Sequence, residues 1–282
     1  MMPRWARDGR VLIGLTLLAV VLVVALFAPL LVPVAPDDQD LLATLLPASW
    51  QEGGDPAHWL GTDSLGRDVF ARLLYGARVA LTVAAIAAPG AMIAGTLAAL
   101  LAGYLGGWFD WLVGRAVDVW MSFPPVILSL ILMVGLGTGT RNVILAIMLV
   151  DWTRFCRVLR AEVLVVARRD YVTAARLVGF GHLRVLVREV FPAIVPLLIT
   201  LLTLEMGIAV VVEAILSFVG LGVKPDEVAW GQMIADGRST IYQAPFNLLA
   251  PVLAIFVTVA GFNLLGDGLR RSLDVRLLEG RG

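Results

Sequence analysis

The sequence predicts an all-α polytopic membrane protein with six transmembrane helices. The chain of 282 residues is 59% hydrophobic and only 16% charged, which leaves too few polar side chains to cover a water-soluble fold of this length. Several charge-free stretches also reach the roughly 20 apolar residues that a helix needs to cross a hydrocarbon core about 30 Å thick. The same composition excludes a disordered chain. The net charge of zero gives no support to nucleic-acid binding through an overall positive field.

The six expected spans follow one another along the chain. Four are free of charges and cover residues 11–36, 79–109, 119–140 and 239–266. Two more are interrupted: residues 142–156 contain Asp151 and Arg154, and residues 191–222 contain Glu205 and Glu213. The first span is too long for the apolar part of a secretory signal, and no A-x-A cleavage site follows it. We therefore interpret it as a retained membrane anchor.

The distribution of basic residues sets the predicted orientation. With the N-terminus inside, all but six of the 22 Lys and Arg residues fall on cytoplasmic segments, where basic loops are retained. The six exceptions are Arg67, Arg72, Arg78, Arg141, Lys224 and Arg238. Both termini are therefore expected in the cytoplasm. The chain then divides into a cytoplasmic N-terminus with the first helix (1–36), an extracytoplasmic loop (37–77) and a core of five helices (78–282).

The second span carries a stripe of small residues. Ala91, Gly95, Ala99 and Gly103 recur every four residues, which places them on one face of a helix. Small side chains let a neighbouring backbone approach closely, so we expect this helix inside a bundle. The alternative is that Ala and Gly are simply frequent in this sequence.

The residues that could carry catalysis or hold a metal do not converge. The chain's only lysine, Lys224, precedes a proline, so no phosphate-binding P-loop is present. His58 and His182 fall on opposite sides of the membrane in the six-helix arrangement and cannot share a metal or catalytic site. Cys156 lacks a neighbouring base and is interpreted as a bystander thiol. We predict no catalytic site and no metal site in this chain.

The predicted cytoplasmic loop, residues 154–191, holds eight arginines and a short amphipathic helix. Tyr171, Ala174, Ala175 and Val178 recur at helical spacing, and glycine at 179 and 181 then ends the helix. The small apolar face suits a helix that lies in a groove of another protein, because alanine lets the backbone come close. The alternative is a basic cytoplasmic loop and nothing more.

This loop resembles a motif of the inner-membrane permease subunits of ATP-binding-cassette (ABC) importers, which reads EAA, three residues, then Gly. Thr173, Ala174, Ala175 and Gly179 stand in that register, and Pro192 occupies the trailing proline position. Thr173 replaces the usual glutamate, which leaves the geometry of the alanines and the glycine intact.

Further blocks narrow the resemblance to the C-type subunit of dipeptide, oligopeptide and nickel permeases. They cover residues 58–78, 103–124, 213–222, 230–238 and 262–276. The resemblance implies the type I importer permease fold, with a coupling helix at about 170–180 that contacts an ATPase. The coupling residues it implies are Asp170, Tyr171, Thr173, Ala174, Ala175, Gly179 and His182.

The same resemblance implies the partners and the location. The partners are a second, B-type permease subunit, two ATPase subunits that bind ATP and Mg, and an extracytoplasmic substrate-binding protein. No cofactor is expected in this chain itself. The chain is expected to span the inner membrane of a bacterium, surrounded by lipid.

Charged residues inside the expected spans are candidates for ion pairs or for a functional role. Arg115 with Asp118, and Asp151 with Arg154, stand one turn apart and predict ion pairs near helix ends. Charges placed in a membrane are costly and are functional candidates by default.

Glu205 and Glu213 have no arginine one turn away and are eight residues apart, about 12 Å along a helix. They are expected either to line a water-filled path, where they would attract a peptide amino group or a divalent cation, or to form hydrogen bonds to the partner subunit. Short peptides are the commonest substrate of the family, with nickel, glutathione and opines as alternatives. A different class, an ATP-independent secondary transporter that moves protons through these acids, also remains open.

The predicted outside segment, residues 224–246, contains Trp230, Met233, Ile234 and Tyr242 at roughly helical spacing. We expect either a short re-entrant or surface hairpin beneath the docked binding protein or an aromatic anchor at the membrane surface.

Overall fold

The computed structural model describes residues 8–273 of the chain. The predicted cytoplasmic ends, residues 1–7 and 274–282, lie outside this described part, as does the end of the block 262–276. Within it, the only β pairing is an isolated antiparallel bridge between Thr62 and Asp68. The all-α fold class predicted from the sequence is confirmed for the described chain.

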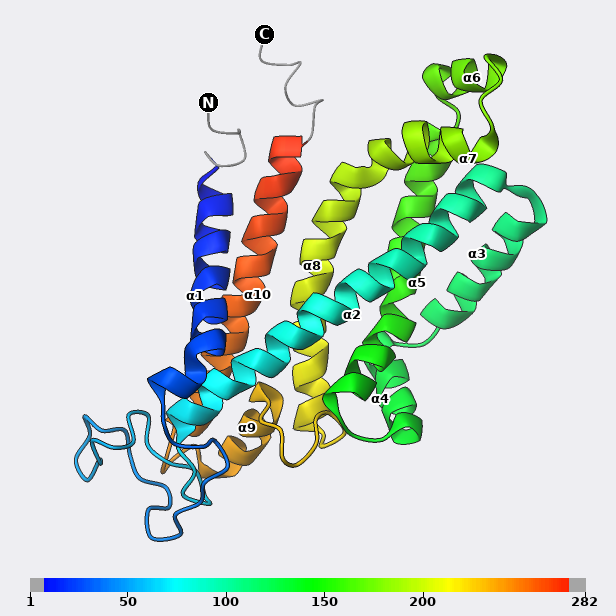
Figure 1. Cartoon of the computed structure of the whole chain (residues 1–282). Coiled ribbons are helices and arrows are strands. Elements are labelled where there is room, and N and C mark those ends of the chain that lie inside the picture. The colour runs from blue at the N-terminus through cyan, green and yellow to red at the C-terminus, as the bar shows by residue number, and fades with distance from the viewer. Residues whose placement is uncertain (1–7, 274–282) are drawn as a thin grey trace.

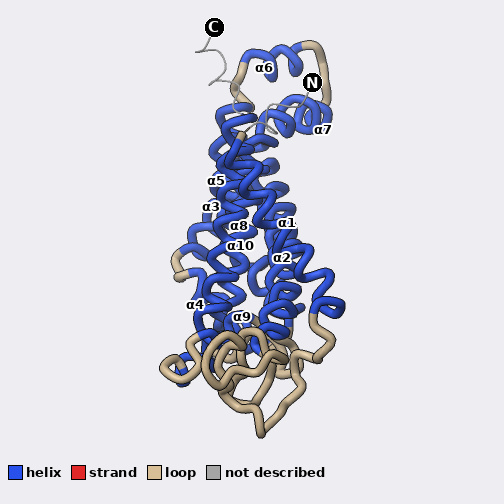
Figure 2. The backbone as a smooth tube through the Cα atoms, turned by 90° about the vertical axis from the view of Figure 1, so that its left-hand side faces the viewer, coloured by secondary structure: helices blue, strands red, loops and turns tan. Residues whose placement is uncertain are grey.

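The helices form an elongated bundle with α6 and α7 at one end and α9 with the long loop at the other (Figures 1 and 2). In chain order they are α1 (Gly9–Leu31), α2 (Val69–Leu105), α3 (Gly107–Met121), α4 (Pro125–Leu136), α5 (Thr140–Val166), α6 (Asp170–Leu177), α7 (His182–Val185), the π-helix η2 (Leu186–Val190), α8 (Phe191–Phe218), α9 (Trp230–Gly237), the 3₁₀-helix η3 (Arg238–Thr240) and α10 (Phe246–Leu273). Helix α1 begins, and α10 ends, at the end of the bundle that carries α6 (Figure 1).

Four described helical segments are long and apolar enough to cross a membrane: α1, α2, His182–Phe218 and α10. A fifth span results if α3 and α4, which meet at an angle of 87°, are taken together. Helix α5 has 27 residues but carries charges along its length. The count of six spans therefore stays a prediction.

The third predicted span, residues 119–140, is wrong as a single straight helix. The chain leaves α3 after Met121 and begins α4 at Pro125. Pro124 and Pro125 account for the break, since proline has no N–H to donate and disfavours helical backbone in the residue before it.

Helix α2 begins at Val69, whereas the sequence placed the loop boundary at residue 77. The Asp68 carboxylate caps the helix by accepting a hydrogen bond from the Ala71 N–H at 2.6 Å. Arg72 and Arg78 make residues 69–78 too polar to be predicted as part of a membrane span. In the structure Arg72 is buried, and the Arg78 Nε donates to the Ala25 carbonyl oxygen of α1 at 2.6 Å.

The stripe of small residues in α2 is confirmed as a contact between helix backbones. A methyl group at Gly95 would lie 2.6 Å from Cβ of Phe155 and 3.0 Å from the backbone nitrogen of Cys156, both in α5. At Gly103 it would meet Val163 of the same helix at 2.8 Å. The stripe therefore seats α5 against α2, and Cys156 is buried beneath it.

Residues 32–68 form a long loop that is held to the bundle by a buried ion cluster. The Asp63 carboxylate accepts hydrogen bonds from Arg72 of α2 and from the Arg67 Nε at 2.7 Å. Arg67 also reaches Asp236 of α9 at 3.2 Å. Burial alone would raise the pKa of Asp63, but backbone N–H groups of Arg67 and Leu65 and the two arginine charges outweigh it and hold the pKa below its ordinary value.

Neutralising Asp63 will therefore loosen this end of the bundle. We expect Asp63→Asn to lower stability by about 3 kcal/mol, since it leaves two largely buried arginines with only the partly exposed Asp236 to pair with, and to lower the Tm of the purified complex by at least roughly 5 °C. Because the folded pKa is depressed, this stabilisation is complete above about pH 4 and is lost as the pH falls below that value. The exposed Asp37→Asn variant is the control. Equal Tm values for the two variants at pH 7 would contradict the role of the cluster.

Candidate functional site

Helix α6, residues Asp170–Leu177, stands at one end of the bundle and ends in a Schellman motif. The Phe180 N–H donates to the Ala175 carbonyl at 3.1 Å, and the Gly179 N–H to the Arg176 carbonyl at 3.0 Å. Gly179 has φ of +89°, in the left-handed region that glycine adopts without steric cost. The predicted helix and its glycine stop are confirmed.

One side of α6 packs on the rest of the chain. Val172 is fully buried and belongs to the same apolar cluster as Leu159 and Val163 of α5 and Val185 of α7. Ala175 is half-buried against that cluster. The small apolar face predicted for a partner is therefore only partly available to one, because Ala175 packs on its own chain. Sequence reasoning missed Val172.

The other side of α6 exposes large apolar side chains. Leu177 is 84% and Val178 is 75% exposed, and Tyr171 is also exposed. Ala174 and Thr173 lie on the exposed part of the helix as well. Exposed apolar groups gathered on a helix that projects from the bundle are typical of a surface that another protein covers.

Arg176 of α6 and His182 at the start of α7 both contact Tyr104, near the C-terminal end of α2. The Tyr104 hydroxyl lies 3.3 Å from Nδ1 of His182, and the Arg176 guanidinium lies 4.7 Å from the centre of the Tyr104 ring. From His182 the chain continues through α7 and η2 into α8, a helical segment of 37 residues. Helix α6 is thus in contact with α2 and is joined to α8 through α7 and η2. No local pattern in the sequence singles out Tyr104 as a contact of this segment.

The predicted loop 154–191 begins too early. Helix α5 continues to Val166, so Arg154, Arg157 and Arg160 lie on a helix. Their charges predict a span that ends near residue 156, which is wrong. The structure shows instead that each of these arginines faces an acid on a neighbouring helix.

These arginines form a row of ion pairs along α5. The Arg154 NH1 group lies 3.2 Å from the Glu205 carboxylate of α8 and its Nε lies 3.9 Å from Asp151. Arg160 forms a bidentate pair with Asp110 of α3, at 2.5 and 2.6 Å. Glu205 has no arginine one turn away, as the sequence shows, but it is paired all the same, because its partner Arg154 lies on another helix.

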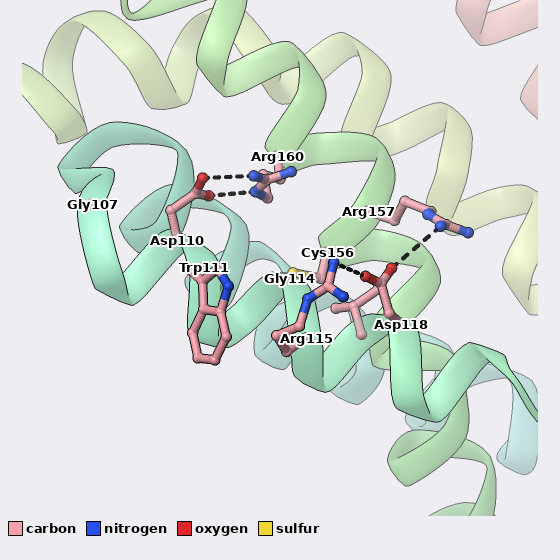
Figure 3. A pocket seen from close by; sticks show the side chains of 10 residues that line it. Gly107, Asp110, Trp111, Gly114, Arg115, Asp118, Cys156, Arg157 and Arg160 are labelled. Atoms are coloured by element: carbon pink, nitrogen blue, oxygen red, sulfur yellow. Dashed lines mark hydrogen bonds and ion pairs between the residues drawn. The ribbon is translucent and has the colours of Figure 1, made fainter.

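Asp118 of α3 is shared by two arginines (Figure 3). Its carboxylate lies 2.7 Å from the Arg115 NH2 group and 3.6 Å from the Arg157 NH2 group. The predicted pair of Arg115 with Asp118 is confirmed, and Arg157 is an additional partner. These side chains line a pocket of about 350 Å³ between α3 and α5.

Glu213 has a different environment. It is 1% exposed, and its Oε1 accepts a hydrogen bond from the Ser217 hydroxyl at 2.6 Å. Its other oxygen, Oε2, is buried without a hydrogen-bond partner among the described residues. Glu205 borders a second pocket, of about 280 Å³, with Arg154 and Arg157. That the two acids line a path stays a prediction.

The segment 224–246 folds as α9 and η3 at the end of the bundle opposite α6 (Figure 1). Trp230 is only 2% exposed, and its Nε1 donates to the Leu73 carbonyl at 2.9 Å. Met233 is also buried, so a surface anchor is the wrong interpretation for these two residues. Tyr242 is 99% exposed.

The two histidines lie at opposite ends of the bundle, as expected: His58 in the loop before α2 and His182 at the start of α7. Among residues 8–273, no three His, Cys, Asp or Glu side chains gather in a way that would hold a metal ion.

A bundle of membrane-spanning length with a short, partly apolar helix projecting at one end defines an integral membrane protein that offers a surface to a partner. Comparison with known sequences gives the family: the chain belongs to the binding-protein-dependent transport system inner membrane components, whose model matches residues 73–279. Residues 3–48 match the N-terminal transmembrane domain of oligopeptide transport permease C. The chain is thus a permease subunit of an ABC importer of the inner membrane.

Named relatives differ in substrate. The chain is 35% identical to the dipeptide transport system permease protein DppC of Alkalihalophilus pseudofirmus, over 94% of this chain and 86% of the relative. It is 38% identical to the nickel transport system permease protein NikC of Escherichia coli K12, over 98% and 96%. It is 39% identical to the glutathione transport system permease protein GsiD of Pectobacterium atrosepticum, over 80% and 75%.

Proposed function

We propose that this chain forms half of the translocation path of an importer for short peptides, in the inner membrane of a bacterium. Relatives named for dipeptides and for glutathione, itself a tripeptide, support this substrate class. Both termini lie in the cytoplasm in this proposal. The chain works with a B-type permease subunit, two ATPase subunits that bind ATP and Mg, and an extracytoplasmic binding protein.

The observation that carries the proposal is the projecting helix α6 with its exposed Leu177 and Val178. In the proposed mechanism this helix seats in a groove of an ATPase subunit. Closure of the two ATPases on ATP displaces the helix, and contacts with α2 and α8 pass the movement to the path. The proposed coupling residues are Asp170, Tyr171, Thr173, Ala174, Ala175, Gly179 and His182. No hydrolysis takes place in this chain.

Reconstituted uptake tests the proposal. The chain is assembled with its permease partner, ATPases and binding protein in proteoliposomes that contain ATP, and entry of labelled dialanine, trialanine and ⁶³Ni²⁺ is measured. We expect ATP-dependent uptake of the peptides alone. Uptake of nickel in their place would overturn the substrate class. Uptake by this chain alone and without ATP would replace the proposal by the secondary-transporter alternative.

Glu205 provides a test of the path. We expect Glu205→Gln to lower peptide uptake about tenfold while the complex still assembles, because the carboxylate borders the pocket beside α5 and holds Arg154 in place. The matched variant, Glu213→Gln, removes the charge from an acid that is enclosed within the chain. A normal uptake rate in the double variant Glu205→Gln, Glu213→Gln would remove both acids from the path.

A further inference from the structure

We propose that the pocket between α3 and α5 binds the terminal carboxylate of a peptide on its way through the membrane. The inference rests on the proposed function, because it assigns a residue-level site to the same substrate class. Its core is the trio of Arg115, Asp118 and Arg157 (Figure 3).

The α3–α5 face carries exposed charges at the expected depth of the hydrocarbon core. Helix α5 is 27 residues long, about 40 Å, against a hydrocarbon core of about 30 Å. Arg157 lies nine residues before the end of α5 and therefore falls within the core if the helix is centred on it. The side chains of Arg157 and Arg115 are nevertheless 57% and 62% exposed. Charges so exposed at this depth are stable only beside a water-filled space or a polar partner.

The pocket carries an excess of positive charge. Three arginines and two aspartates line it, and the Asp110–Arg160 pair is already satisfied by its two hydrogen bonds. Arg115 and Arg157 are left to share Asp118, and the second contact is loose at 3.6 Å. Two guanidinium groups carry more N–H donors than one carboxylate accepts. A second carboxylate can therefore bind between them, in the planar geometry that arginine favours.

The pocket also has the size and lining for part of a small ligand. Its volume of about 350 Å³ falls at the lower end of the range typical of ligand sites. Gly114 is one of the lining residues and leaves open space where a side chain would stand, and Trp111 presents an exposed ring beside the charges. The neighbouring pocket shares Arg157 and continues to Arg154 and Glu205. The two pockets together mark a charged route along α5 toward the middle of the bundle.

Protection of an introduced thiol tests the site without ATP or binding protein. In the assembled complex of both permeases and ATPases, in lipid nanodiscs, Trp111→Cys is introduced in a Cys156→Ala background. The rate of reaction with a membrane-impermeant anionic thiosulfonate is then measured. We expect millimolar trialanine to slow the reaction about fivefold or more, and trialanine amide to slow it by less than about twofold, because the amide lacks the charge that pairs with arginine.

Two further variants are the controls. Adding Arg115→Gln and Arg157→Gln should abolish the protection. Val113→Cys, about 200° around α3 from Trp111 and packed against the buried apolar cluster, should remain unreactive. An unreactive Trp111→Cys thiol in the complex would overturn the proposal, since it would place the partner subunit or lipid against this face. Equal protection by trialanine and its amide would overturn it as well. Failure of the uptake assay with selective protection intact would count against the proposed function and not against this site.

Discussion

Replacing Gly179 with leucine will uncouple transport from ATP hydrolysis while leaving the complex assembled. Gly179 has φ of +89°, where a leucine costs about 1–3 kcal/mol, and no atom outside its chain neighbours lies within 4 Å of an added Cβ. The strain therefore comes from the backbone conformation and not from a steric clash. To relieve it, the Schellman motif opens and the last turn of α6 loses its fixed position. We expect peptide uptake to fall more than about tenfold, with ATP hydrolysis and subunit co-purification retained.

Gly181 is the matched control for this change. It lies two residues further on, also in open space, but its φ of −63° is accessible to any residue. Gly181→Leu should therefore leave uptake nearly normal. Equal losses in the two variants would show that bulk on the surface is responsible and that the helix stop is not. Normal uptake by Gly179→Leu would remove α6 from the coupling mechanism.

Replacing Gly95 with valine will have the largest effect on stability. The new Cβ would lie 2.6 Å from Cβ of Phe155 and 3.0 Å from the Cys156 backbone nitrogen, and it would also press on the Trp152 carbonyl. Two of these atoms belong to the backbone of a long helix and the third is a Cβ fixed directly to it, so none can turn aside and α2 and α5 must separate. We expect a loss of about 3 kcal/mol or more, seen as a Tm lowered by at least roughly 5 °C or as failure to assemble.

Gly135→Val in α4 is the control for this second change. It makes the same substitution in a helix, but no atom lies within 4 Å of the added Cβ. Its Tm should stay within a few degrees of the unmodified complex. A Gly95→Val complex as stable as the Gly135→Val complex would contradict the close contact of α2 with α5.

Features encoded by local pattern were predictable from the sequence. Apolar runs locate α1, α2, α8 and α10, and the four-residue recurrence of small side chains in α2 predicts that another helix packs closely on it; the structure identifies that helix as α5. The stop of α6 at Gly179 followed from the known preference of glycine for left-handed backbone. Each of these signals lies within one element and needs no knowledge of its neighbours.

Features that depend on contacts between elements were not predictable. Arg154, Arg157 and Arg160 were assigned to a loop because charge normally marks the end of a span. Their acidic partners on α3 and α8 are about 40 to 50 residues away in sequence, so no local spacing predicts these pairs. The contact between the Tyr104 hydroxyl and His182 joins residues 78 apart in sequence and is unpredictable for the same reason. The bend between α3 and α4 could have been read from Pro124 and Pro125.

The most direct test of the account is whether α6 touches an ATPase in the assembled importer. A photoactivatable maleimide is attached to Val178→Cys in a Cys156→Ala background, and to Trp59→Cys in the loop at the opposite end as the control. The account predicts that light links the label at position 178 to an ATPase subunit and that the label at position 59 forms no such product. A label at position 178 that links to lipid or to no protein would contradict it.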